Sequence, residues 1–293
     1  MGNPAICAHQ LRKHYGDTQA LKGVSVDIAP GQICALLGQN GAGKTTFIHC
    51  ALGLIPASSG TIEVLGEGAG SLAAKKRIGV MLQDTDLPDL LTPREHIERF
   101  ACYYDNPQPT DALIVDSGIA AFAEQRYKTL SGGQKRRVQF AVALVGQPDV
   151  LFLDEPTTGL DQEARQDVWR NIRRLADSGT TVILTTHYLE EADALADRIV
   201  VIHDGQVIAD DAASTIRSQV GGSMIACHTR LDNKQLEALP GVRSVSLSGR
   251  IAQLLSEDAP ASLLALLLAD PDLTDLTVTK PSLNEAFVAL TEA

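Results

Sequence analysis

The stretch ICALLGQNGAGKTT, residues 33–46, decides the fold of this chain. Residues 33–37 are apolar throughout, which predicts a strand that is covered on both faces. Residues 38–45 match the pattern G-x-x-x-x-G-K-[ST], and residues 44–54 predict a helix behind that loop. Strand, loop and helix in this order predict a phosphate-binding site in an α/β protein. A chance glycine-rich turn is the alternative, and the flanking elements and the Lys-Thr pair argue against it.

The loop supplies groups that suit a nucleotide. Its glycines let successive backbone N–H groups point inward around phosphate oxygens. We expect Lys44 to reach the β- and γ-phosphates and the Thr45 hydroxyl to bind Mg²⁺. The residues of this loop that we expect to contact nucleotide are Gly38, Asn40, Gly41, Gly43, Lys44, Thr45 and Thr46.

A second apolar run, residues 150–153, ends in two carboxylates, Asp154 and Glu155. Ligands of open α/β sheets gather at the carboxyl ends of the strands. We therefore expect Asp154 to coordinate Mg²⁺, directly or through water, and Glu155 to orient and deprotonate a water that attacks the γ-phosphate. Solvated acids at a strand end are the alternative, which the phosphate loop makes the weaker interpretation.

A third segment is Leu130-Ser131-Gly132-Gly133-Gln134. Ser131 predicts the N-cap of a helix that runs to about Val145, and a structural cap is the simplest interpretation. A helix start with serine and glycine is also an anion site, because its N–H groups are free and the glycines allow close approach. The nucleotide site is already built without this segment, so it is predicted to serve a site on another chain.

Strands and helices alternate up to about residue 220, which predicts a mainly parallel sheet with helices on both faces. Residues 21–28 alternate apolar and polar, as in a half-buried antiparallel strand, and residues 198–209 predict a hairpin around Asp204-Gly205. Further strands are predicted at 60–65, 77–83 and 181–185, and helices at 93–118, 162–178 and 189–196. The glycine-rich residues 66–70 are interpreted as a flexible surface loop.

The composition changes near residues 220–223, which we interpret as a domain boundary. The elements beyond it follow the order βαββαβ, the split βαβ or ferredoxin-like arrangement. The predicted domains are 1–220, with a helical subdomain at about 87–146, and 221–293, with a last helix at 283–291. The small domain has strands at 223–229, 242–248, 250–256 and 273–279, and helices at 232–239 and 259–269.

The bulk properties narrow the class of protein. The 293 residues include 25 basic and 36 acidic ones, and the net charge of -11 disfavours nucleic acid as a partner. Five scattered cysteines favour a reducing compartment. The N-terminus lacks the pattern of a signal peptide, and the most apolar run, residues 263–269, is far short of the ~20 residues that span a bilayer. We expect a cytoplasmic chain whose role at a membrane requires a partner that supplies the spans.

Together these motifs, over residues 5–220, resemble the nucleotide-binding domain of an ABC transporter. The resemblance implies ATP and Mg²⁺, and a head-to-tail homodimer in which Leu130 to Gln134 act in trans on the partner's nucleotide. It implies that Tyr15 stacks on adenine, that Gln83 is the Q-loop glutamine at the metal and water, and that His187 is the switch histidine at the γ-phosphate. Asp161 would belong to the D-loop, residues 159–161, which in that family crosses the dimer interface. Each residue also has a local alternative. Tyr15 could be a surface aromatic and Gln83 a polar loop residue. His187 could be a helix-capping histidine and Asp161 the N-cap of the next helix.

The tail, residues 281–287, and the segments 87–95 and 135–137 resemble ATPases that serve ABC-2-type exporters. The tail could also be an ordinary amphipathic helix. The implied partner is an integral membrane permease, with the chain peripheral at the inner face of the membrane. Two other functions stay open, a non-transport ABC ATPase and a regulatory protein whose output is nucleotide-dependent dimerisation. A GTPase is disfavoured because no Asn-Lys-x-Asp motif follows the loop.

Overall fold

The computed structural model describes residues 3–83, 85–219, 222–280, 283 and 287. The chain forms two compact units, Met1–Asp211 and Ala212–Ala293. Among the described residues, no helix is both long and apolar enough to cross a bilayer. Most of the tail at 281–287 and of the helix expected at 283–291 lies outside the described residues.

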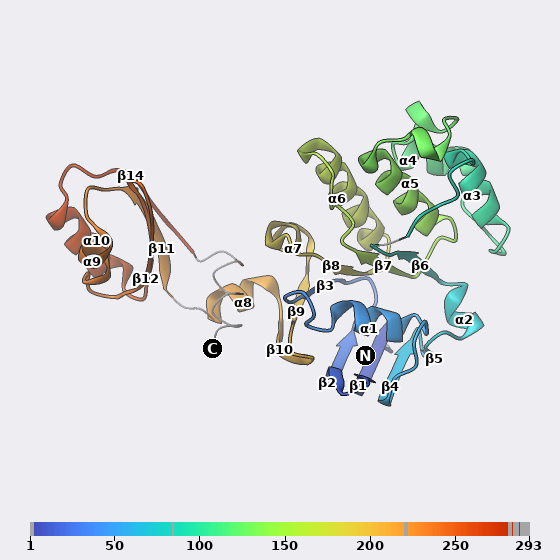
Figure 1. The fold of residues 1–293 in the computed structure, drawn as a ribbon, viewed down its shortest axis with the longest axis horizontal. Coiled ribbons are helices and arrows are strands. Elements are labelled where there is room, and N and C mark those ends of the chain that lie inside the picture. Colours follow the sequence, from blue (N-terminus) through green and yellow to red (C-terminus); the bar gives the residue numbers. More distant parts are fainter. Residues whose placement is uncertain (1–2, 84, 220–221, 281–282, 284–286, 288–293) are drawn as a thin grey trace. The chain divides into compact units, whose positions relative to one another are not determined.

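The first unit is organised by a six-stranded sheet with the order β10-β9-β3-β8-β7-β6 (Figure 1). Its strands pair in parallel, except β10, which pairs antiparallel with β9. Every residue of β3, β7 and β8 is buried, which confirms the prediction of strands covered on both faces. The strands are β3 (Ile33–Leu37), β6 (Ile78–Met81), β7 (Val150–Asp154), β8 (Thr181–Thr185), β9 (Arg198–His203) and β10 (Gln206–Asp211). Because β3, β8, β7 and β6 are parallel, their carboxyl ends lie at one edge of the sheet.

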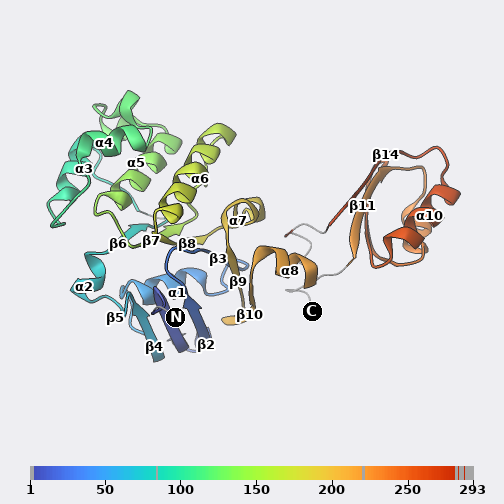
Figure 2. The ribbon, with the colours of Figure 1, turned by 180° about the vertical axis from the view of Figure 1, so that it is seen from behind.

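An antiparallel sheet, with the order β2-β1-β4-β5, forms a second layer. Its strands are β1 (Ile6–Tyr15), β2 (Thr18–Ile28), β4 (Ser59–Val64) and β5 (Glu67–Gly68). Helix α1 (Lys44–Ala51) lies between the two sheets in both views (Figures 1 and 2), and its Phe47 and Ile48 are fully buried in the shared core. The helix was expected to reach Leu54, but it ends at Ala51, because Gly53 turns the backbone into the left-handed region at φ 66°.

The opposite face of the six-stranded sheet carries α5 and α6, and α3 and α4 pack against α5 (Figure 2). The helical segment expected at 93–118 consists of two helices, α3 and α4. The remaining helices of this unit are α2 (Leu72–Lys75), α3 (Pro93–Ala101), α4 (Thr110–Asp116), α5 (Gly132–Leu144), α6 (Gln162–Asp177) and α7 (Leu189–Leu195), with 3-10 turns at Ala120–Phe122 and Tyr127–Thr129. The glycine-rich residues 66–70, expected as a flexible loop, include the two-residue strand β5.

The second unit has the element order βαββαβ that the sequence predicts, preceded by α8, which it did not. Its sheet has the order β12-β13-β11-β14, with all neighbours antiparallel. Alternate residues Ile225, Cys227, Ala252 and Leu254 face the core beneath α9 and α10. The elements are α8 (Ala213–Gln219), β11 (Ser223–His228), α9 (Asn233–Glu237), β12 (Val242–Ser248), β13 (Ile251–Ser256), α10 (Ala259–Ala269) and β14 (Thr274–Thr279).

Gly60 in β4 offers a test of the packing between β1 and β4. Its φ is 81°, and a Cβ there would lie 2.2 Å from the carbonyl oxygen of Gln10. Gly66 has a similar φ of 76° but no heavy atom within 4 Å of such a Cβ. We expect Gly60→Ala to lower the free energy of unfolding by about 2–4 kcal/mol, since backbone strain and a clash add, whereas Gly66→Ala should cost about 1 kcal/mol from strain alone. Urea unfolding of the two variants measures this difference, and equal losses would contradict the close approach of β1 to β4.

Candidate functional site

The phosphate loop at the end of β3 has room only for glycine at two of its positions. A Cβ at Gly38 would lie 2.3 Å from the carbonyl oxygen of Ile202 in β9. A Cβ at Gly43, where φ is 111°, would lie 2.6 Å from the carbonyl oxygen of Ala20 in β2. The loop is therefore packed closely between two strands, and glycine is required for the packing as well as for the turn.

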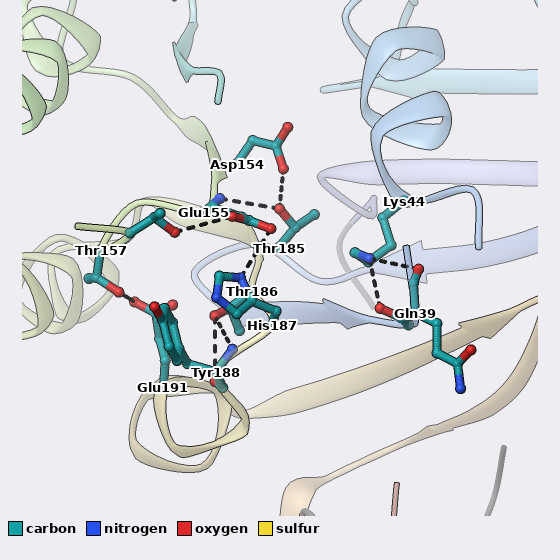
Figure 3. Close-up of polar contacts among 12 residues, drawn as sticks. Gln39, Lys44, Asp154, Glu155, Thr157, Thr185, Thr186, His187, Tyr188 and Glu191 are labelled. Atoms are coloured by element: carbon teal, nitrogen blue, oxygen red, sulfur yellow. Dashed lines mark hydrogen bonds and ion pairs between the residues drawn. The ribbon is translucent and has the colours of Figure 1, made fainter. Parts of the chain in front are cut away.

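Lys44 begins α1, and its side chain folds back over the loop (Figure 3). Its Nζ donates hydrogen bonds to the carbonyl oxygens of Gly38, at 2.7 Å, and Gln39, at 3.1 Å. Burial lowers the pKa of Lys44, and the nearby charges of Glu155 and Asp154 oppose that shift. The ammonium group thus lies where the two carboxylates act on it, while Thr45, the next residue, is exposed.

Asp154, at the end of β7, is held by the neighbouring strand β8. It is 4% exposed, and the Thr185 hydroxyl donates a hydrogen bond to its Oδ1 (Figure 3). The same hydroxyl accepts a hydrogen bond from the backbone N–H of Glu155 at 3.3 Å. One threonine therefore fixes the position of both acidic residues at this edge of the sheet.

Glu155 has an unusual backbone for its residue type, with φ 51°. A left-handed residue that is not glycine costs about 1–3 kcal/mol and persists where its surroundings hold it. Here the backbone N–H donates to the Thr185 carbonyl oxygen at 3.0 Å. The side chain is held as well, since Oε2 accepts a hydrogen bond from Thr158 at 3.1 Å and Oε1 lies 3.2 Å from Nδ1 of His187 (Figure 3). The strained turn thus aims the carboxylate at the histidine.

His187 follows β8, and Gln83 follows β6 on the far side of β7. The imidazole side chain is 46% exposed and lies 4.0 Å, centroid to centroid, from the ring of Tyr188. Gln83 is exposed. Because β3, β8, β7 and β6 are parallel, the fold places four predicted segments at one edge: the loop with Lys44, the two carboxylates, the histidine and the glutamine.

Tyr15 ends β1 in the antiparallel sheet, just before a left-handed Gly16. Its ring is half-exposed, and Nζ of Lys13 lies 5.1 Å from the ring centroid. An exposed aromatic face with a cation beside it suits a flat, electron-rich base. The stacking role of Tyr15 stays a prediction.

The segment Leu130 to Gln134 starts α5 with the predicted cap. Ser131 Oγ accepts a hydrogen bond from the Gln134 N–H at 3.2 Å, and the Gln134 side chain accepts one from the Ser131 N–H at 2.9 Å, which is a capping box. Ser131 and Gly132 are exposed, and a Cβ at Gly132 would meet open space. The exposed backbone of this helix start is therefore accessible from outside the chain.

The D-loop, residues 159–161, lies between β7 and α6. Asp161 Oδ1 accepts a hydrogen bond from the Ala164 N–H at 2.8 Å, so Asp161 is the N-cap of α6, one of its two predicted roles. A Cβ built on Gly133 would lie 3.3 Å from a methyl group of Leu160. The D-loop and the start of α5 are therefore in contact within one chain.

Arg136, one turn into α5, joins this helix to two other segments of the predicted site. Its guanidinium donates to the carbonyl oxygens of Leu82 and Gln83, at 3.2 and 3.3 Å, and to that of Glu155 at 3.0 Å. It also donates to the Gln139 side chain at 3.0 Å. The helix that starts with Ser131 is thus bound to the backbone of the glutamine loop and of the predicted base.

The sequence alone predicted no role for Arg136, Thr185 or Thr158. Arg136 and Gln139 share a face of α5 by their spacing of three residues, but the carbonyl oxygens that they contact have no sequence signal. For Thr185 the sequence did contain a signal, because a hydroxyl residue at the end of a buried strand indicates a polar contact there.

The residues predicted to hold Mg²⁺ are oxygen donors, Thr45, Gln83 and Asp154. Among the described residues, no cluster of three His, Cys, Asp or Glu side chains could hold a metal on its own. A single buried carboxylate beside a phosphate loop fits Mg²⁺, which usually takes one or two carboxylates together with phosphate oxygens and water. The donor set suits a metal that arrives with nucleotide.

Comparison with known proteins agrees with this geometry. Residues 21–158 match the family model described as ABC transporter. The chain is 37% identical to the daunorubicin resistance ATP-binding protein DrrA3 of Streptomyces coeruleorubidus, over 99% of this chain and 97% of that protein. It is 35% identical to the Nod factor export ATP-binding protein I of Rhizobium sp. (strain N33), over 99% and 98%. The structure resembles an ATP-binding subunit of an ABC transporter, with a TM-score of 0.68 and 25% identity over 74% of this chain and 93% of that one. It also resembles a dimeric post-hydrolysis cassette bound to ADP and Pi, with a TM-score of 0.65 and 25% identity over 71% and 98%.

Proposed function

The chain belongs to the ABC transporter family, and from this membership we propose that it hydrolyses ATP to power export through a separate membrane permease. The observation that carries the proposal is the Glu155–His187 pair at the end of β7 and β8, on the same sheet edge as the Lys44 loop. Relatives that match over nearly the whole chain bear names of drug-resistance and Nod factor export proteins.

Each residue at the sheet edge has a separate role in the proposed hydrolysis. The N–H groups and glycines of residues 38–43 surround the phosphates, and Lys44 exchanges its two carbonyl contacts for phosphate oxygens. Glu155 accepts a proton from the attacking water, and His187 contacts the γ-phosphate while it holds the carboxylate. Thr45, Gln83 and Asp154 would hold Mg²⁺, which neutralises charge on the phosphates when it is bound.

The exposed helix start at Ser131 to Gln134 completes a second chain's site. Two copies pair head to tail, and each Lys44 loop faces the partner's serine and glycines. ATP at this interface adds contacts that exist only in the closed dimer, so binding shifts the population toward closure. Hydrolysis and loss of the γ-phosphate remove those contacts, and the dimer opens.

A permease is proposed to dock on an apolar groove beside the glutamine loop. The groove has a volume of about 290 Å³ and lies between the end of α1, β6, α3 and α5. Its apolar lining is Leu52, Leu54, Ile78, Val80, Leu82, Phe100, Tyr104, Val142 and Ala143. Leu54 is 57% exposed at its margin, and Leu82 precedes Gln83, so an inserted element would touch the segment that leads into the nucleotide site. Tyr103 is exposed but does not line the groove.

Leu54→Glu tests the docking. We expect it to weaken binding to membrane vesicles that contain the permease by about tenfold or more, because a carboxylate at an apolar contact loses its hydration. Leu72→Glu is the matched control, since Leu72 is also an exposed leucine but does not line the groove. Co-sedimentation with vesicles from source cells that lack the endogenous chain measures the difference, and liposomes of the extracted lipids report any binding to lipid alone. Equal binding by the two variants would contradict the groove as the docking site.

Two other functions remain as alternatives, a non-transport ABC ATPase and a regulator whose output is dimerisation. Neither requires a membrane partner. Vesicles that bind the parental chain no better than the liposomes do would favour those alternatives over transport.

A further inference from the structure

Glu191 is a fully buried carboxylate that has no role in the ATP hydrolysis proposed above. It lies in the first turn of α7 and is 0% exposed. Its Oε1 accepts hydrogen bonds from the Thr157 hydroxyl, at 2.9 Å, and from the indole N–H of Trp169, at 3.0 Å. A buried carboxylate is costly to desolvate, so its position requires these donors and constrains them in return.

The two donors come from segments on either side of the D-loop. Thr157 lies two residues after Glu155 and is itself fully buried, and Trp169 lies in α6, which follows Asp161. Figure 3 shows Glu191 beside Thr157, below the Glu155–His187 pair. Thr157 and Glu191 are 34 residues apart in sequence, and their bond is therefore a tertiary link between the D-loop segment and α7.

The start of α7 is in turn joined to the switch histidine. Tyr188, its N-cap, follows His187 directly, and its N–H donates to the Thr186 hydroxyl at 2.9 Å. The histidine therefore lies in a short, hydrogen-bonded turn between β8 and the helix that carries Glu191. A shift of α7 relative to Thr157 would move His187 relative to Glu155.

We propose that Glu191 is a positioning residue that joins the D-loop to the switch-histidine segment through the Thr157–Glu191–Trp169 bridge. The bridge maintains the contact between His187 and Glu155, and it transmits a movement of the D-loop at the dimer interface to both residues. This inference rests on the proposed ATP hydrolysis by Glu155 and His187. Glu191 does not touch nucleotide, so its effect falls on the geometry of the reacting groups rather than on ATP affinity.

Steady-state kinetics give the first test. We expect Glu191→Ala to lower kcat by about 10- to 100-fold with little change in KM for ATP, because a displacement of about 1 Å at reacting groups has an effect of this size. Glu191→Gln keeps an acceptor oxygen for both donors and should restore most of kcat. Glu190→Ala is the matched control, since Glu190 is the preceding acid on α7 and is exposed. A slow Glu191→Gln chain, or a Glu191→Ala chain with parental kcat, would overturn the bridge.

Fluorescence gives a second test that does not depend on turnover. Trp169 is the sole tryptophan of the 293 residues, so tryptophan emission reports on the bridge itself. In a Glu155→Gln background, ATP should change that emission, and adding Thr157→Val should remove most of the change, because valine keeps the shape of threonine but loses the hydroxyl. The proposal would be overturned if ATP did not change the tryptophan emission, or if the change were still present with Thr157→Val.

The two proposals fail in different ways. If the parental chain does not hydrolyse ATP, the proposed function is wrong. If the parental chain hydrolyses ATP and Glu191→Ala folds, binds ATP and turns over at the parental rate, only the bridge is wrong. Should Glu191→Ala fail to fold, the emission of the Glu155→Gln chain, measured with and without Thr157→Val, still decides the question.

Discussion

Replacing Glu155 with glutamine is expected to lower kcat for ATP hydrolysis by about 10²- to 10⁴-fold, the range that a positioned general base contributes. Glutamine can keep the contacts with the Thr158 hydroxyl and the His187 ring, so the strained turn at φ 51° should persist. The amide cannot accept the proton of water, and the variant should therefore bind ATP without consuming it. Phosphate release under saturating ATP measures the rate.

The same variant should accumulate as an ATP-bound dimer. If ATP closes the interface and hydrolysis opens it, a chain that binds but does not hydrolyse should double in mass on adding ATP, as measured by light scattering. Glu163→Gln is a suitable control, because Glu163 is an exposed acid in the first turn of α6. Near-parental turnover in Glu155→Gln would remove Glu155 from the role of base.

Mixing two inactive variants is expected to restore activity. Ser131→Arg places a bulky cation at the exposed start of α5, and Lys44→Ala removes the ammonium that is proposed to bind the phosphates. In a head-to-tail dimer of one chain of each kind, one of the two sites combines an intact Lys44 loop with an intact serine. An equimolar mixture should therefore recover up to about a quarter of parental activity, because half of the dimers are mixed and each has one good site.

The controls for this experiment are each variant alone, at the total concentration of the mixture. Both should be close to the background rate. A mixture that stays at background, while both chains fold and bind one another, would place Ser131 in its own chain's site or outside catalysis. Recovery would locate each site between two chains.

The sequence predicts those parts of the fold whose cause is local. Residues 33–37 form a strand with the expected bounds, because a short apolar run that ends at a glycine is typical of a strand buried on both faces. Ser131 and Gln134 form the expected helix start, because a capping box needs only residues that are three apart. The βαββαβ order of the second unit follows from alternation and turn residues in the same way.

The remaining features depend on contacts between distant segments. The left-handed backbone of Glu155 is enforced by Thr185, 30 residues away, and nothing at Glu155 itself indicates it. The contacts of Arg136 go to carbonyl oxygens, which every residue has, so no pattern of side chains marks them. α2 and α8 are short, and helices of four to seven residues are set by tertiary packing more than by propensity.

The position of Arg136 has a consequence for the dimer as a whole. Its helix begins with the serine and glycines that are proposed to act on the partner's nucleotide, and its guanidinium donates a hydrogen bond to the carbonyl oxygen of Glu155, the predicted base of its own chain. In the proposed head-to-tail pair, contacts would therefore connect one nucleotide, through the opposite chain, to the predicted base Glu155 of that chain, and by symmetry the reverse connection would exist as well. In such a pair, a change in geometry at one nucleotide site would alter the geometry of the other site. A dimer built in this way would couple ATP hydrolysis at one site to the geometry of the other site through direct contacts within each chain.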